Sequence, residues 1–240
     1  MGGRSRQNCL HTIGQTDFPT SDHRLSRVFY SIDAEYNVQE AGRPSCSRYV
    51  STHPAPSLPE SALPPTSLTL RHVFLGKGTQ NYTCANTSST PVAAGALATL
   101  YDISCQVTDP KSRTKFDQKL IPDFLKNFSK PVQDLLPSKA PGASVGVHYF
   151  RDGSTPMFVL NDGHFVAAGK VGGCAAPSCA TGNENGAAVD WLKLARKQGE
   201  VYGGIEEVYR VQTAGGRAPA ACSKPGPLTV EYVAEYWMYG

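Results

Sequence analysis

The last third of the chain carries two stretches in which apolar and polar residues alternate with a period close to two. A glycine pair, Gly215 and Gly216, and then Pro219 lie between them. Such patterning, bounded by glycine and proline, is typical of antiparallel strands with one buried face. We therefore expect the end of the chain to lie in the core. The apolar positions are Ile205, Val208, Tyr209 and Val211 in the first stretch, and Leu228, Val230, Tyr232, Ala234 and Tyr236 in the second.

Earlier segments repeat this pattern. From Leu68, LTLRHVFLGKGTQNYTC indicates a strand, a turn at Gly76 and Gly78, and a second strand that ends at Cys84. PVAAGALATLYDISC, ASVGVHYF, TPMFVL and HFVAAGKV indicate further strands, the last three separated by Asp-Gly turns at Asp152 and Asp162. Between them, apolar residues recur at helical spacing and predict one or two short helices, interrupted by prolines. These apolar residues are Phe116, Leu120, Phe124, Leu125, Phe128, Val132 and Leu136.

The pattern predicts a mainly β protein: an antiparallel β-sandwich or barrel with a small helical insertion. Residues 1–66 lack lasting periodicity and close in HPAPSLPESALPPTS, so we interpret them as an N-terminal extension and proline-rich linker. Residues 67–240 form the predicted single β-rich domain. An exposed edge strand could support a homodimer, although nothing in the sequence requires one.

Charge and hydropathy exclude two classes of partner. The chain has 23 basic and 20 acidic residues, a net charge of +3, and no basic stripe interleaved with aromatic residues. We therefore expect no nucleic-acid binding. No run of about 18 apolar residues occurs, so we expect no membrane span. The first residues lack the apolar segment of a signal peptide, which leaves the localisation open.

Motifs for nucleotide and hydrolytic chemistry are weak. Gly76-Lys77-Gly78 lacks the third glycine and the following helix of a dinucleotide-binding turn, and no P-loop occurs. The segment 142–146 fits G-x-S-x-G around Ser144, and possible triad partners follow it: His164, with Asp162, Asp152 or Asp190. However, a strand-like segment follows Ser144, where a nucleophile elbow requires a helix. A glycine-containing loop that opens a strand explains the motif better.

Polar and aromatic residues inside the predicted strands are the candidate site residues. His148 is either a core histidine bonded to a backbone carbonyl or a general acid or base. Arg210 and Gln212 share strand parity, and the default for Arg210 is an ion pair with Glu206, Glu207 or Glu231. The candidate catalytic residues, as hydrogen-bond donors to a substrate, are His148, Tyr149, Arg210, Gln212 and Tyr232. The candidate substrate-binding residues are Met157, Phe158, His164, Trp191 and Tyr236.

The segments WLKL, YRVQTAGGRAP and VEYVAEYW, with the earlier NYTC, GVHYF and NDG, resemble a family of small fungal and bacterial proteins of unknown function. Members are often labelled "malate dehydrogenase", and some are implicated as hetero-Diels-Alderases of fungal tropolone-sesquiterpenoid biosynthesis. Members usually look secreted. The family pattern implies a disulfide between Cys84 and Cys222.

The other cysteines leave alternatives open. Cys174 and Cys179 could close a short local loop, which leaves Cys105 to pair with Cys46 or Cys9 and one thiol free. Cys174-x4-Cys179 has no matching second pair, so we expect no zinc site and no other cofactor.

The resemblance implies a cofactor-free cyclase that joins a tropolone o-quinone methide to a humulene-type sesquiterpene. Such a cycloaddition needs an apolar pocket and one or two hydrogen-bond donors, but no metal, nucleotide or nucleophile. The alternatives are a secreted, non-catalytic binder of small lipophilic molecules or glycans, and a structural surface protein.

Overall fold

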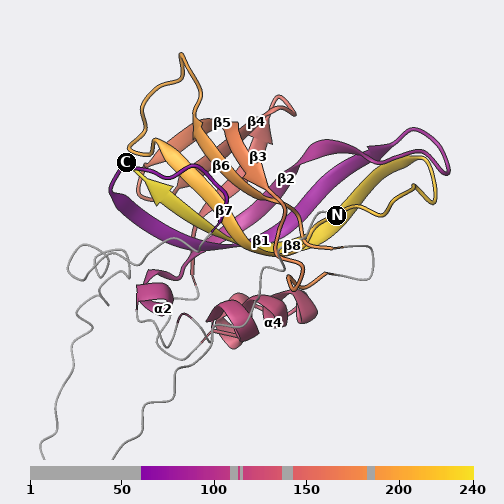
Figure 1. Ribbon diagram of the computed structural model, residues 1–240, viewed down its shortest axis with the longest axis horizontal. Helices are drawn as coiled ribbons and strands as arrows, with labels where there is room; N and C mark the ends of the chain where they lie inside the picture. The colour runs from indigo at the N-terminus through magenta and orange to yellow at the C-terminus, as the bar shows by residue number, and fades with distance from the viewer. Residues whose placement is uncertain (1–60, 109–112, 114–115, 137–142, 183–186) are drawn as a thin grey trace, which may run out of the picture. The chain divides into compact units, whose positions relative to one another are not determined.

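Eight antiparallel strands form a closed barrel in the computed structural model, which describes residues 61–108, 113, 116–136, 143–182 and 187–240. Each strand pairs with its neighbours in the chain, and β8 pairs with β1 to close the sheet (Figure 1). The predicted mainly β, antiparallel fold is confirmed, and it is a barrel. The predicted extension lies almost wholly outside the described residues. The strands are β1 (Leu70–Cys84), β2 (Val92–Asp102), β3 (Ser144–Arg151), β4 (Thr155–Leu160), β5 (Phe165–Cys174), β6 (Trp191–Arg196), β7 (Glu207–Gly215) and β8 (Gly226–Tyr239).

Side-chain alternation produces one apolar cluster inside the barrel and another outside it. On β8, Tyr232, Ala234, Tyr236 and Met238 belong to the interior cluster, and the intervening Val233, Trp237 and Tyr239 belong to the outer one. The helical insertion covers the outer cluster, because buried residues of α4 pack against β7 and β8. The second half of β8 is therefore buried on both faces, whereas the period-two pattern predicts one buried face.

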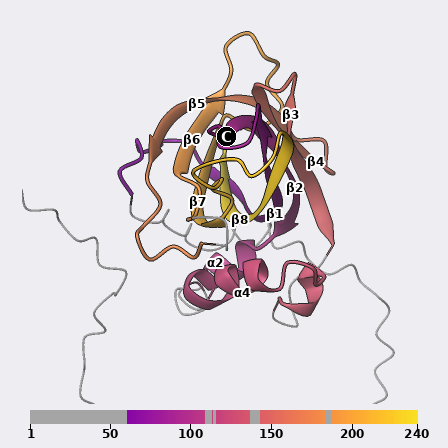
Figure 2. The same ribbon diagram turned by 90° about the vertical axis from the view of Figure 1, so that its right-hand side faces the viewer.

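The helical insertion follows β2, as predicted, and consists of short elements. Figure 2 shows α2 and α4 together at one side of the strands. Pro122 lies in the first turn of α4, where a missing backbone N–H is tolerated. The elements are α2 (Ser104–Thr108), the π-helical turn η1 (Phe116–Leu120), α4 (Ile121–Lys126) and the 3-10 turn η2 (Val132–Asp134). No helix among the described residues is long and apolar enough to cross a membrane.

The predicted turn at Gly76 and Gly78 is wrong, because β1 runs unbroken through both residues. Because these glycines lack a side chain, neighbouring groups can approach the strand closely. A side chain at position 76 would overlap the ring of Tyr236, and one at position 78 would overlap the backbone of β2. Glycine inside a strand often marks such a close approach.

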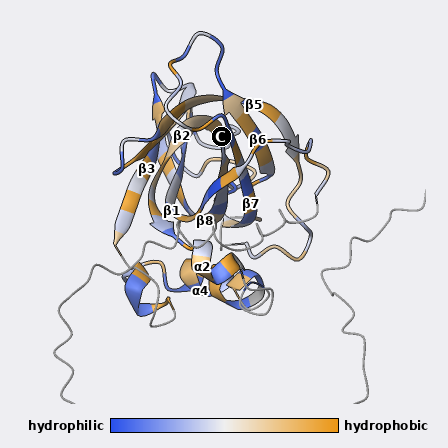
Figure 3. Cartoon of the chain, turned by 90° about the vertical axis from the view of Figure 1, so that its left-hand side faces the viewer, coloured by the Kyte–Doolittle hydropathy of each residue, from blue (hydrophilic) through white to orange (hydrophobic). Residues whose placement is uncertain are grey.

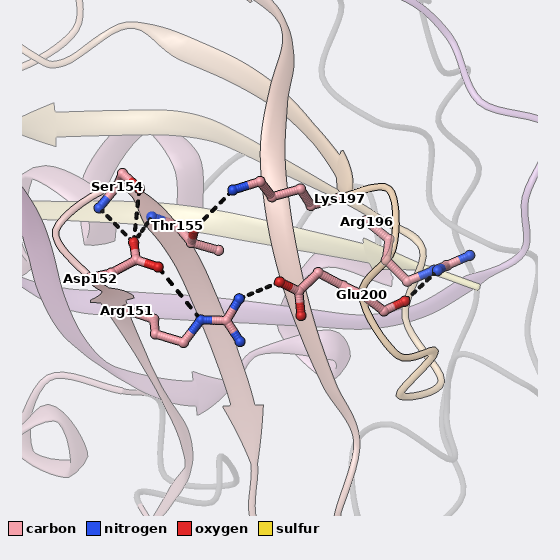
Figure 4. A network of polar contacts seen from close by, with 7 residues as sticks. All are labelled: Arg151, Asp152, Ser154, Thr155, Arg196, Lys197 and Glu200. Atoms are coloured by element: carbon pink, nitrogen blue, oxygen red, sulfur yellow. Dashed lines mark hydrogen bonds and ion pairs between the residues drawn. The ribbon is translucent and has the colours of Figure 1, made fainter.

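The two Asp-Gly turns are where the sequence predicts them. Asp152 has φ 53° and accepts hydrogen bonds from the residues after it, including the N–H of Thr155 at 3.2 Å. A polar network ties this turn to the loop after β6: Arg151 pairs with Glu200, and Lys197 donates to the hydroxyl of Thr155 at 3.2 Å (Figure 4).

One predicted disulfide is confirmed and one is wrong. Cys84 and Cys222 are bonded, so the end of β1 is linked to the loop before β8. Cys174 is a free thiol, whereas Cys179 is disulfide-bonded and must have another partner. Cys174 is instead the last residue of β5, where it lies opposite Trp191 and packs against the outer cluster. Cys105 is also disulfide-bonded.

The end of the predicted linker packs on the barrel. Leu63 is buried, the hydroxyl of Tyr209 donates to the carbonyl of Pro64 at 2.7 Å, and the ammonium of Lys193 donates to that of Pro65 at 2.9 Å. The folded domain therefore includes a few residues before β1.

Candidate functional site

The barrel interior brings together five of the ten predicted site residues: His148, Phe158, Arg210, Tyr232 and Tyr236. His148 is 3% exposed, and its ring stacks on Phe158 with 4.2 Å between centroids. Its Nδ1 lies 2.9 Å from the carbonyl oxygen of Met157, to which it donates. Burial lowers the pKa of His148 to about 4, so the imidazole is neutral near pH 7. This geometry matches the core-histidine alternative.

Tyr232 and Tyr236 form the polar centre of the interior. Their hydroxyls are 2.8 Å apart, and burial raises the pKa of both groups. Arg210 shares strand parity with the interior residue Val208, and its positive charge partly offsets the effect of burial on both tyrosines. The hydroxyl pair and Arg210 are thus potential donors among aromatic walls.

The predicted ion pair of Arg210 is wrong for the two nearest candidates. Its Nη2 and Nε donate instead to the carbonyl of Asp190, at 2.9 and 3.2 Å. Glu206 pairs with Arg196 and Glu207 with Lys193. Arg210 therefore anchors the segment before β6.

The other predicted residues lie elsewhere. Gln212 has φ 46° at a bulge in β7, which breaks its parity with Arg210, and its amide donates to Asp117 of η1 at 3.1 Å. Trp191 is buried in the outer cluster. Tyr149 and Met157 alternate with interior residues and so belong to the outer face. His164 lies in the turn before β5.

The described residues form two hollows, one on the outer face of the barrel and one at an end of it. The larger, of about 290 Å³, is an open groove on the outer face of β1 and β2, beside the residue Phe128 that follows α4. The ammonium of Lys77 lies 4.8 Å from the centre of the Phe128 ring and donates to the carbonyl of Lys130 at 2.8 Å. Burial lowers the pKa of Lys77. The lining residues are Lys77, Gly78, Thr79, Leu97, Ala98, Thr99, Tyr101 and Phe128.

Exposed apolar side chains extend this groove onto β3. Leu97 is 55% exposed and lies opposite Tyr149, which is 36% exposed; Thr99 lies opposite Val147, which is 41% exposed. Hydrophobic bands along β3 are visible in Figure 3. We call the lining residues together with Val147 and Tyr149 the outer groove.

The smaller hollow, of about 180 Å³, is the mouth of the barrel. Phe74 and Leu160, which belong to the interior cluster, are among its lining residues. Polar residues surround them: His72, Asp102, Ser144, Asn161 and Asp162.

Two histidines meet a carboxylate at this mouth. Ligand atoms of His72, Asp162 and His164 lie within 4.8 Å of one another. Burial lowers the pKa of His72, and the charges of Asp162 and Asp102 partly offset this effect. The mouth therefore carries titratable side chains, whereas the outer groove is mainly apolar.

Ser144 of the G-x-S-x-G segment is the first residue of β3, so a strand follows it and no nucleophile elbow forms. It nevertheless lines the mouth with Asp162, as does His72, which the triad hypothesis did not include. Asp102, Lys77, Leu97 and Phe128 also line these hollows, although they are not among the site residues predicted from the sequence. A detectable signal existed for His72 and Asp102, because both are polar residues at inward-facing positions of otherwise apolar strands.

The chain belongs to a family described as a protein of unknown function (DUF3455), whose model matches residues 64–240. This agrees with the resemblance to a family of unknown function. No curated protein and no solved structure matches the chain.

Proposed function

We propose that this member of the DUF3455 family binds small lipophilic molecules in the outer groove. The observation that carries the proposal is the continuity of the groove with Leu97, Val147 and Tyr149, which leave apolar area exposed on two paired strands. A contiguous apolar surface with a polar rim is typical of interaction sites. A hollow of about 290 Å³ suits a small molecule.

Lys77 supplies the polar anchor of this site. An ammonium has three N–H donors, and one of them is used by the carbonyl of Lys130. The remaining donors favour a ligand that carries a carbonyl, carboxylate or sulfonate oxygen at one end of an apolar body. The ring of Phe128 beneath the ammonium provides an apolar contact beside that anchor.

The disulfides support a function in an oxidising compartment. Cys84–Cys222 links distant parts of the chain, and Cys105 and Cys179 are bonded as well. Such bonds persist in secreted proteins and are rare in a reducing cytosol. This supports the secreted binder over an enzyme of the cytosol.

The fluorescent probe 1-anilinonaphthalene-8-sulfonate tests the proposal, because it joins apolar rings to a sulfonate. We expect Leu97→Glu to weaken probe binding about tenfold, which corresponds to about 1.4 kcal/mol of lost apolar contact. Val171→Glu is the matched control. Val171 lies on β5 and is 56% exposed, so this substitution adds the same charge away from the groove. Equal effects of the two variants would contradict the proposal.

A second pair of measurements tests the anchor. We expect Lys77→Met to weaken binding of the sulfonate probe while leaving binding of the neutral N-phenyl-1-naphthylamine nearly unchanged. Equal weakening of both probes would show that Lys77 shapes the groove and does not pair with the ligand.

The hetero-Diels-Alderase remains a second candidate, favoured by the convergence of His148, Arg210, Tyr232 and Tyr236 on the aromatic interior. The donors could stabilise the oxygen of a quinone methide, provided that the interior opens to admit substrate. A hydroxymethyl tropolone precursor incubated with humulene tests it. Faster formation of one stereoisomer than in a control without protein supports the cyclase; a racemic product at the background rate excludes it for this pair.

A further inference from the structure

The mouth of the barrel has the composition of a metal site, and we propose that it binds a divalent transition ion through His72, Asp162 and His164. This site is separate from the outer groove and goes beyond the lipophilic binding proposed above. It also departs from the expectation of no zinc site, which considered cysteine spacing and not these histidines. Imidazole and carboxylate ligands suit Zn²⁺, which also binds three protein ligands and one water in its open sites.

The positions of the three side chains support coordination. Their ligand atoms already lie within 4.8 Å of one another. Tetrahedral ligands at about 2.1 Å from Zn²⁺ are about 3.4 Å apart, so the required closure is on the order of 1 Å. Asp162 and His164 have side chains that are about half exposed, and rotation of these two can supply that closure.

Local contacts keep the three side chains near one another. The carboxylate of Asp162 accepts the backbone N–H of His164 at 3.0 Å and lies 3.0 Å from its Nδ1. Gly204, with φ 87°, leaves the space that the imidazole of His164 occupies, because any side chain at position 204 would overlap it. His72 stacks on Phe74 with 5.1 Å between ring centroids.

Neighbouring residues complete the arrangement. Asp102 is buried at the mouth and its charge acts on His72, as an outer carboxylate does on a metal-bound histidine. Ser144 and Asn161 line the same hollow. With three protein ligands, a fourth coordination position would be left for a water or an oxygen-bearing ligand.

Zinc titration by calorimetry tests the proposal on the full, untagged chain after treatment with EDTA, at pH 7. We expect one site, and we expect His164→Ala and Asp162→Asn each to weaken binding by about 100-fold or more, since loss of an outer ligand alone costs 10–100-fold. Substitution with Co²⁺ should give visible absorption bands that these variants lose.

Asp152→Asn is the matched control. Asp152 is also an Asp-Gly turn residue that accepts backbone N–H groups, but it lies at the β3–β4 turn. We expect this variant to bind zinc like the parent protein. Absence of binding by the parent protein, or equal affinity in all variants, would overturn the proposal. Because the naphthalene probes report the outer groove, failure of either proposal leaves the other result interpretable.

Discussion

His148 makes the barrel sensitive to acid, because burial in the interior disfavours the charged imidazolium. The ring is 3% exposed, stacked on Phe158 and bonded to the carbonyl of Met157. Its pKa falls from 6.5 to about 4, with burial as the main cause. We therefore predict that acid destabilises the protein through this residue.

The magnitude follows from linkage. A pKa that is lowered on folding means that the unfolded chain binds the proton more tightly, so the stability from this group is fully present above pH 6.5 and declines toward pH 4. Lowering the pKa of His148 from 6.5 to about 4 corresponds to about 3 kcal/mol. This is a large part of the 5–15 kcal/mol typical of a folded domain.

Urea unfolding at pH 7 and pH 4 provides the assay, with His148→Gln as the comparison. The variant lacks the imidazole, while the other titratable groups contribute equally to the pH dependence of both proteins. The difference between the two proteins therefore reports His148. We predict that the parent protein loses about 3 kcal/mol more than the variant between these pH values. Equal losses, or a pKa near 6.5 for His148 by NMR, would refute the reasoning.

Two further predictions concern stability. Replacing Cys84 and Cys222 together by serine should lower the free energy of unfolding by about 5 kcal/mol, because the bond closes a loop with a sequence separation of 138. Thermal and urea unfolding check this, and a change below about 1 kcal/mol would contradict it. Glu235 is buried against Asp117 beneath the helical insertion, and burial followed by the facing charge of Asp117 raises its pKa well above the usual value. The contribution of Glu235 to the free energy of unfolding is full below the unfolded pKa of 4.5 and falls as pH rises. Glu235→Gln should therefore remove part of the loss of stability between pH 5 and pH 8 in urea titrations; an unchanged pH dependence would contradict this.

Local sequence patterns predict the strands well, since alternation and Asp-Gly turns are properties of neighbouring residues. The wrong predictions fall at positions where a contact distant in sequence determines the local structure. Gly76 and Gly78 resemble a turn, but they admit Tyr236 and the backbone of β2 to an unbroken strand. Gln212 loses its parity with Arg210 at a bulge in β7.

The candidate sites were only partly predictable for the same reason. Inward-facing residues such as His148 and Tyr236 could be found from parity, and they do meet in the interior. The mouth combines His72 from β1 with Asp162 from the β4–β5 turn, and only closure of the barrel brings these together. Phe128 lines the outer groove with residues of β1 and β2, and the periodicity of the sequence does not indicate that these segments lie side by side.

Backbone amide NMR during titration with 1-anilinonaphthalene-8-sulfonate tests the central claim most directly, because it reports the binding position. We predict saturable shifts at residues 77–79, 97–99, 101 and 128, which line the outer groove. Shifts confined to residues around the mouth, or scattered shifts that do not saturate, would contradict a lipophilic site at the outer groove.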